Sequence, residues 1–309
     1  MAVVGKLLVI LGPTASGKSD LAVALAQAAG AEILSVDSMQ VYRGMDIGTA
    51  KPGPADQAAV RHHLIDLVEP SEPFTVARYV AAADAVIVDA AGRGVPLIAT
   101  GGTPLYFKSL FEGLFEGPGA DPEIRARLGA LGADGLAARL RAVDPAAADR
   151  IHGNDIRRMV RALEVYELTG KRISSLQTEW AAAQPRHAAT WVGLHWDREI
   201  LNRRINARFK AMLAAGWLEE TRALLARYGD FSLTAGEATG YQELIEHLQG
   251  KTTLEEAGEQ IKIATRQLAR RQMKWFRRFA NVKWIAGEKP LEELTREVMD
   301  YWMKDGAAI

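Results

Sequence analysis

A glycine-rich segment near the N-terminus holds the side chains best suited to chemistry. Residues 12–19 read GPTASGKS and match the complete P-loop pattern G-x-x-x-x-G-K-[ST]. In such a loop the glycines let backbone N–H groups converge on phosphate oxygens, and the following helix adds positive potential at its N-terminus. Lys18 would neutralise the far phosphate, and the Ser19 hydroxyl would bind Mg²⁺. The predicted phosphate-binding residues are Gly12, Thr14, Ala15, Ser16, Gly17, Lys18 and Ser19.

A carboxylate stands where it could reach the same phosphates. Asp37 directly follows the apolar run 33–36, which is typical of a buried strand. Because the carboxyl ends of parallel strands face the ligand crevice, we predict a functional role for Asp37. Asp89 also ends an apolar run, but it lies in a helical pattern and is interpreted as a surface residue. Most P-loop proteins act on ATP or GTP, so this pattern alone leaves the phosphorylated ligand open.

Three further segments carry polar groups beside predicted strand ends. Gln40 lies in a polar loop after Asp37, where its amide could read a base edge or a backbone group, or simply be solvated. A second glycine-rich turn, Gly101-Gly102-Thr103, follows an apolar run, and glycine lets backbone approach a ligand closely. The adjacent histidines 62–63 have no cysteine and no third ligand at useful spacing, so we interpret them as loop anchors rather than as a metal site.

Clusters of basic side chains indicate a polyanionic partner. Residues 265–278 contain no acid, and their basic side chains recur at helical spacing, so they share a face. Backbone phosphates of a nucleic acid are the natural partner of such a face. The interleaved Trp275 and Phe276 are more typical of core, and some arginines could serve a small phosphorylated substrate. The smaller clusters are Arg157, Arg158 and Arg161, and Arg203, Arg204 and Arg208.

The elements that must position these groups follow an α/β pattern. Strands are predicted at 6–11, 32–36 and 95–100, with helices at 18–29 and 76–91. Continuous apolar strands between helices favour a parallel sheet covered on both faces. We therefore predict an α/β fold with a P-loop nucleoside-triphosphatase-like core, a parallel sheet flanked by helices, and an all-helical insertion domain.

The insertion begins where convincing strands stop. Charged helical patterns fill the middle of the chain until an apolar run at 190–196 returns to the sheet. The last third is helical, with one short strand at 282–285. The predicted domains are a core of residues 1–114 and 189–309 and a helical insertion of residues 115–188.

Composition limits the remaining classes. The chain has 309 residues with 38 basic and 38 acidic side chains, so a polyanion must be recognised by local clusters rather than by net charge. The absence of cysteine excludes thiol catalysis, disulfides and iron–sulfur clusters. No apolar run is long enough to span a bilayer. We expect a cytoplasmic monomer that does not associate with membranes.

Taken together, these segments resemble the bacterial tRNA dimethylallyltransferase family. Pro104 departs from the small or flexible residue usual in the GGT-x-LY turn, and Arg270-Arg271 stands where the family usually has Lys before Arg-Gln. The resemblance covers nearly the whole chain, in order. It rests on GPTASGKS (12–19), DSMQVYRGMDIGTAKP (37–52), HHLID (62–66), GGTPLY (101–106), RALEV (161–165), TGYQE (239–243) and TRQLARRQMKWF (265–276).

The resemblance implies a reaction and a set of roles. The P-loop would hold the diphosphate of dimethylallyl diphosphate with Mg²⁺, and the acceptor would be the exocyclic N6 amine of the adenosine 3′ of the anticodon, tRNA position 37. The products would be isopentenyladenosine and diphosphate. Asp37 would be the catalytic carboxylate that receives or orients the amine proton, while Lys18, Ser19 and Arg208 would stabilise the leaving diphosphate.

The same resemblance implies where tRNA is held. The helical insertion would clasp the anticodon stem-loop. The residues expected to contact tRNA are Ser38, Gln40, Thr103, Arg161, Gln267, Arg270, Arg271, Gln272 and Lys274.

Three other functions stay open at this point. A small-molecule or nucleotide kinase would use the P-loop for phosphoryl transfer but leaves the acid-free basic helix unexplained. Prenylation of free adenine nucleotides would not need the large insertion. A noncatalytic nucleic-acid-binding switch driven by a nucleoside triphosphate would leave Asp37 without a task.

Overall fold

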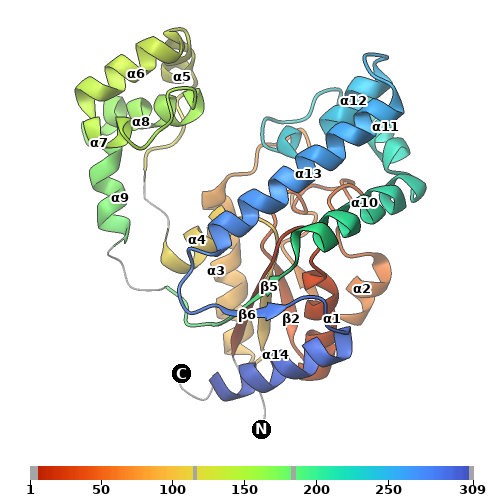
Figure 1. Cartoon of the computed structure of the whole chain (residues 1–309). Helices are drawn as coiled ribbons and strands as arrows, with labels where there is room; N and C mark the ends of the chain where they lie inside the picture. Colours follow the sequence, from red (N-terminus) through yellow and green to blue (C-terminus); the bar gives the residue numbers. More distant parts are fainter. Residues whose placement is uncertain (1–5, 114–116, 182–185, 306–309) are drawn as a thin grey trace. The chain divides into compact units, whose positions relative to one another are not determined.

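Two compact units make up the chain (Figure 1). The computed structural model describes residues 6–113, 117–181 and 186–305. The larger unit combines Met1–Leu110 with His187–Ile309, and the smaller unit is Phe111–Arg186. The insertion predicted from the sequence spans 115–188.

A parallel sheet of six strands forms the centre of the larger unit. Every neighbouring pair of strands runs parallel, in the order β3-β2-β4-β1-β5-β6. The central strand is buried along its whole length, as expected for a strand covered on both faces. The predicted α/β fold is therefore confirmed. The strands are β1 Leu7–Leu11, β2 Glu32–Ser35, β3 His62–His63, β4 Leu97–Thr100, β5 Thr190–His195 and β6 Lys283–Ala286.

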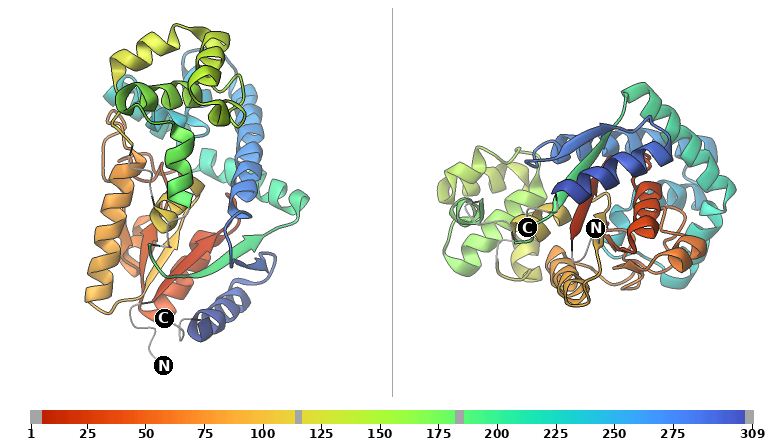
Figure 2. Two further views of the ribbon diagram at one scale, coloured as in Figure 1. Left: turned by 90° about the vertical axis from the view of Figure 1, so that its left-hand side faces the viewer. Right: turned by 90° about the horizontal axis from the view of Figure 1, so that it is seen from below.

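Helices flank this sheet on both sides (Figure 2). Helix α14 packs against α1, and α10 packs against α13. Within the described residues, no helix is both long and apolar enough to cross a membrane. The helical elements of this unit are α1 Lys18–Ala29, α2 Pro54–Ala59, α3 Val76–Gly92, α4 Pro104–Glu112, α10 Arg198–Ala214, α11 Trp217–Tyr228, the 3₁₀ helix Ala235–Glu237, α12 Tyr241–Leu248, α13 Leu254–Phe276 and α14 Leu291–Asp305.

The long helix α13 has strong start signals and two distinct faces. Thr253 caps its N-terminus by accepting a hydrogen bond from the Glu256 N–H, and the Glu256 side chain completes a capping box. Acidic side chains in the first turn and Lys274 in the last turn complement the helix dipole. A stripe including Ile261 and Phe276 is buried, whereas Arg270, Arg271 and Lys274 are exposed on the outer face.

Two short elements were not predicted from the sequence. Helix α2 has six residues and buries none, and strand β3 has only two. The β3 histidines are anchors within the protein. His62 Nδ1 lies 2.8 Å from the Val60 carbonyl oxygen, and His63 Nε2 lies 2.7 Å from Glu32 Oε2. The contact of His63 with Glu32 fastens β3 to β2 at the sheet edge.

The smaller unit is helical and has a core of its own. Buried leucines from three of its helices form one cluster, together with Met159 and Ile173. Glu164 is fully buried and accepts hydrogen bonds from Arg125 and Arg161, so its charge is paired. The helices are α5 Pro122–Gly129, α6 Gly132–Val143, α7 Pro145–Ala148, α8 Ile156–Thr169 and α9 Ile173–Ala181.

Candidate active site

The P-loop joins the end of β1 to the start of α1 at the carboxyl edge of the sheet. Ala15 and Gly17 have φ angles of 64° and 84°, in the left-handed region that non-glycine residues rarely adopt. Alternating backbone conformation of this kind turns successive N–H groups toward an anion. The Ser16 hydroxyl is buried and has no hydrogen-bond partner among the residues that the structure describes. The loop thus presents unfilled donors at the N-terminus of a twelve-residue helix.

Two side chains hold this loop from outside. Arg204 donates through Nε to the Ala15 carbonyl oxygen at 2.8 Å, and Trp196 donates through Nε1 to the Ser16 carbonyl oxygen at 3.1 Å. The Arg204 guanidinium stacks on the Trp196 ring, 4.4 Å from its centroid. The sequence placed Arg204 in a basic cluster but gave no signal for either contact, because each partner lies about 180 residues away or more.

Lys18, Arg208 and Asp37 lie close enough to influence one another's charge. Burial and the positive charge of Arg208 lower the pKa of Lys18 to about 8, although Asp37 opposes that shift. Burial also lowers the pKa of Arg208, against the carboxylates of Asp37 and Asp20. The Arg208 guanidinium donates to Thr14 Oγ1 at 3.3 Å. The positive charges of Lys18 and Arg208 thus repel each other beside the P-loop, and a bound polyanion would offset this repulsion.

The turns after β2 and β4 are fastened together around Asp37. Asp37 Oδ1 accepts a hydrogen bond from the Met39 N–H at 2.9 Å. Thr103 Oγ1 accepts from the Ser38 N–H at 2.9 Å, and the Thr103 N–H donates to the Val36 carbonyl oxygen. Ser38 and Thr103 therefore lie beside the carboxylate, as members of the turns that orient it.

Two stacked tyrosines lie within electrostatic range of the same carboxylate. The rings of Tyr79 and Tyr106 have centroids 4.0 Å apart. Burial is the main cause that raises the pKa of each phenol, and the charge of Asp37 adds to both shifts. Both phenols therefore stay neutral and form an uncharged, buried pair near Asp37.

The loop that follows Asp37 is braced from within the protein. Gln40 accepts from the Ser35 hydroxyl at 2.8 Å and donates to the Ala50 carbonyl oxygen at 3.1 Å. Glu220 accepts from the Ile47 N–H at 2.7 Å and from the Tyr241 hydroxyl at 2.6 Å. The Gln40 amide, which the sequence assigned to tRNA contact, is thus used to shape this loop.

The remaining residues predicted to contact tRNA fall into three places. Gln272 is only 4% exposed and lies beneath the outer face of α13. Arg161 belongs to the helical unit, where it donates to Glu164 at 2.7 Å and to the Pro118 carbonyl oxygen at 2.8 Å. The others are exposed on α13: Gln267, Arg270, Arg271 and Lys274.

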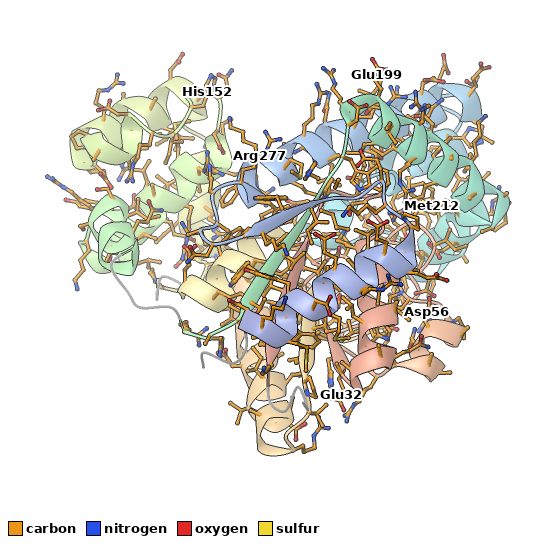
Figure 3. All side chains as sticks on the ribbon, turned by 60° about the horizontal axis from the view of Figure 1, so that its bottom comes forward. Glu32, Asp56, His152, Glu199, Met212 and Arg277 are labelled. Atoms are coloured by element: carbon orange, nitrogen blue, oxygen red, sulfur yellow. The ribbon has the colours of Figure 1, made fainter. Side chains whose placement is uncertain are left out.

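A mostly apolar pocket opens beside the P-loop. Thr14, Ala15 and Arg208 line one side of it, and apolar side chains of α10 and α13 line much of the rest. Met212, labelled in Figure 3, belongs to this lining. Ala15 itself packs against Ile205 and Ala269 in a small buried cluster. The arrangement suits a ligand with a charged end and an apolar end.

The donors near the P-loop are oxygen atoms. The Ser19 side chain is exposed at the start of α1, and Asp37 lies two residues after the end of β2 at the same edge of the sheet. Within the described residues, no cluster of three histidine or acidic side chains forms a ready-made metal site. Mg²⁺ commonly takes few protein ligands and completes its shell with substrate phosphates and water, so this donor set fits it.

Comparison with known proteins gives a consistent result across the chain. A family model described as IPP transferase matches residues 40–279, and one described as isopentenyl transferase matches residues 5–69. A tRNA dimethylallyltransferase of Anaeromyxobacter dehalogenans is 50% identical over 298 residues, covering 95% of this chain and 99% of that protein. A tRNA dimethylallyltransferase of Symbiobacterium thermophilum is 48% identical over 307 residues, with 96% of each chain covered.

Solved structures agree with these relatives. The tRNA isopentenylpyrophosphate transferase of Bacillus halodurans superimposes with a TM-score of 0.73 at 36% identity, covering 98% of both chains. A eukaryotic dimethylallyltransferase acting on tRNA gives a TM-score of 0.77 at 28% identity, covering 91% of this chain and 74% of that one. The family model spans more than half of the sequence, and the relatives cover nearly all of it. The chain therefore belongs to the IPP transferase family, the family of the tRNA dimethylallyltransferases.

Proposed function

We propose that this protein is a tRNA dimethylallyltransferase. It transfers the dimethylallyl group of dimethylallyl diphosphate to the N6 amine of the adenosine immediately 3′ of the anticodon in tRNA. The observation that carries the proposal is the grouping of two cations and one carboxylate, Lys18, Arg208 and Asp37, around a P-loop in a chain of this family. A kinase acting on a small molecule would leave the acid-free basic segment 265–278 without a task.

The reaction needs a stabilised leaving group and a modest base. The amine nitrogen forms a bond to C1 of the dimethylallyl group while the C1–O bond breaks, and the bonding electron pair leaves with the diphosphate. Lys18, Arg208 and the P-loop N–H groups stabilise the charge that develops on the leaving oxygens. The Asp37 carboxylate accepts the proton that the amine loses, a role worth typically about 10²–10⁴-fold in rate.

Magnesium fits the leaving-group side of this site. Mg²⁺ bound by the Ser19 hydroxyl and by diphosphate oxygens would supply additional neutralisation of the leaving group. The exposure of Ser19 at the start of α1 supports this assignment. Lys18 and Arg208 do not depend on the ion, so they keep part of the phosphate affinity when it is removed.

The apolar pocket supports a place for the prenyl group. It begins at Thr14 and Arg208, where the diphosphate would bind, and continues between α10 and α13 over side chains such as Ile205 and Phe209. An apolar tail buried there displaces water from the reacting carbon. A dry surrounding strengthens the electrostatic contacts of the cations and prevents hydrolysis of the allylic diphosphate.

We also propose that tRNA binds through two basic surfaces. The exposed side chains Arg270, Arg271 and Lys274 form one of them on α13, and the helical unit would hold the anticodon stem-loop. Because the relatives named above are bacterial, we propose that the protein acts on tRNA in the cytoplasm. We propose a monomer, because the site groups named above come from one chain; light scattering of the purified protein tests this.

The decisive experiment follows a label from the donor. Purified protein, Mg²⁺ and unmodified tRNA are mixed with dimethylallyl diphosphate labelled in the prenyl group, and in parallel with ATP labelled in the γ-phosphate. We expect prenyl label in the tRNA. In Asp37→Ala, turnover should fall by roughly a hundredfold or more, with tRNA affinity nearly unchanged.

The control replaces an acidic residue outside the site. Asp56, labelled in Figure 3, is exposed on α2, so Asp56→Ala should transfer label at the wild-type rate. Phosphate transferred from ATP to a small molecule, with no prenyl label in tRNA, would contradict the proposal. A loss of tRNA binding in Asp37→Ala would contradict the role assigned to the carboxylate.

A further inference from the structure

One buried glutamine lies beneath the basic face of α13. Gln272 is 4% exposed, whereas Arg271 and Lys274 close to it are exposed. A buried side-chain amide is almost always hydrogen-bonded, since leaving its polar atoms unpaired and away from water is unfavourable. The partners of this amide therefore indicate what it does.

Both ends of the Gln272 amide bind backbone of the active-site loops. Gln272 Oε1 accepts a hydrogen bond from the Thr14 N–H at 2.8 Å, and Gln272 Nε2 donates to the Gly102 carbonyl oxygen at 2.7 Å. Thr14 belongs to the P-loop after β1, and Gly102 belongs to the turn after β4. One side chain thus joins two loops that otherwise come from separate strand ends.

Under the proposed function, one of these loops binds the leaving diphosphate and the other lies beside the Asp37 carboxylate. Thr14 also receives a hydrogen bond from Arg208, so it lies on the diphosphate side. Gly102 lies on the carboxylate side, because a Cβ atom added there would be 3.1 Å from Asp37 Oδ2 and 2.8 Å from Gln272 Nε2. The Gln272 amide therefore occupies the space between the leaving group and the base.

We propose that Gln272 is a positioning residue, which sets the distance between the P-loop and the Asp37 carboxylate by holding Thr14 and Gly102 with one amide. The proposal rests on the proposed function for its effect on transfer, and on geometry alone for its effect on the loops. A misplacement of about 1 Å between reacting groups can reduce a rate by about 10²-fold. The hydrogen bonds of Gln272 have this effect without any contact to tRNA.

Two substitutions separate the two hydrogen bonds. Gln272→Met keeps a similar length but removes both bonds, while Gln272→Glu keeps an oxygen that accepts from the Thr14 N–H and loses the donor to Gly102. In both variants kcat for prenyl transfer should fall by about 10- to 100-fold, with KM for tRNA and its salt dependence nearly unchanged. The matched control is Gln260→Met, an exposed glutamine on the same helix, which should transfer label at the wild-type rate.

Hydrogen exchange supplies a readout that does not depend on activity. Exchange of the Thr14 amide should become at least about tenfold faster in Gln272→Met and stay near the wild-type rate in Gln272→Glu, since only Glu retains an acceptor. Thermal unfolding of each variant reports whether it is folded, and the Glu variant preserves the side-chain volume.

Different results would overturn different claims. Wild-type kcat with a raised KM for tRNA in Gln272→Met would show a tRNA contact and overturn the positioning role. Unchanged Thr14 exchange in that variant would overturn the hydrogen bond itself. Wild-type protein that transfers no prenyl group would contradict the proposed function, while the exchange experiment would still test the Gln272 contact.

Discussion

Lys18 has an electrostatic environment that makes its charge sensitive to pH. Burial and Arg208 lower its pKa to about 8, so in the free protein it carries a proton below that value and loses it above. A bound diphosphate would favour the charged form again. Affinity for the diphosphate is therefore linked to the proton on this one amine.

This linkage predicts weaker diphosphate binding at alkaline pH. Between pH 7 and pH 9 the dissociation constant for inorganic diphosphate should rise roughly tenfold, because most of the charge on Lys18 is lost over that interval. Isothermal titration calorimetry at each pH measures it. Lys18→Arg keeps its charge and should show a flat profile, and Lys18→Ala should bind weakly throughout. A wild-type profile equal to that of Lys18→Arg would refute the linkage.

Local sequence patterns predicted several residues of the candidate site but not the side chains that support them. The P-loop and Asp37 could be predicted because their spacing follows from the chemistry of phosphate binding and from the position of a strand end. Arg204 and Gln272 could not be given their observed roles, since their partners lie 189 and 258 residues away in the chain. The family resemblance assigned Gln272 to tRNA contact, and helical spacing alone does not show that its side chain is buried.

At the scale of the element, the two faces of α13 differ in their contacts. Its inner face contributes to the apolar pocket and holds the P-loop, and its outer face exposes Arg270 and Lys274. Solvated helix faces usually mix charges of both signs, whereas this outer segment is purely basic. A helix of this kind can bind tRNA on one side and support chemistry on the other.

Charge reversal on the outer face tests the tRNA side. Replacing Arg270 and Lys274 by Glu should weaken tRNA binding and reduce the slope of log K against log salt by about 1–2, as each cation that meets a phosphate contributes somewhat less than one unit. Binding of diphosphate should be unaffected. The control reverses Arg222 and Arg227 on α11, which are exposed but outside the proposed surface. An unaltered slope in the α13 variant would show that this helix does not meet phosphate.

Long elements were predictable and very short ones were not. The central strands were indicated by their continuous apolar runs, and α13 by its helical pattern. The two-residue strand β3 has too few residues for any periodicity, and α2 buries none of its side chains. Each forms because of contacts that tertiary structure supplies, such as that between His63 and Glu32.

At the scale of the whole molecule, the two units have separate hydrophobic cores. Leu163 is fully buried in the core of the helical unit, and Leu8 and Ile10 are fully buried in that of the sheet unit. The two cores have no buried residue in common. Damage to one core therefore need not unfold the other.

A cavity introduced into the core of the helical unit should weaken tRNA binding without weakening diphosphate binding. Leu163→Ala removes buried methyl groups and should destabilise the helical unit by about 2–5 kcal/mol. Hydrogen exchange over residues 121–169 should accelerate, and tRNA affinity should fall, while diphosphate affinity stays near the wild-type value. Leu168→Ala is the control, because Leu168 is exposed on the same helix. Equal acceleration of exchange in β1 would mean that the units unfold together.

The two ends of the helical unit meet at one hydrogen bond, where the Arg186 N–H donates to the Phe111 carbonyl oxygen at 2.9 Å. The helical unit is therefore a single insertion into the chain of the sheet unit. A short turn in its place would close the chain without changing the order of the strands. In evolutionary terms, such a unit can be acquired, exchanged or lost in one event, so that recognition of an RNA can change while the chemistry of the sheet edge is inherited intact.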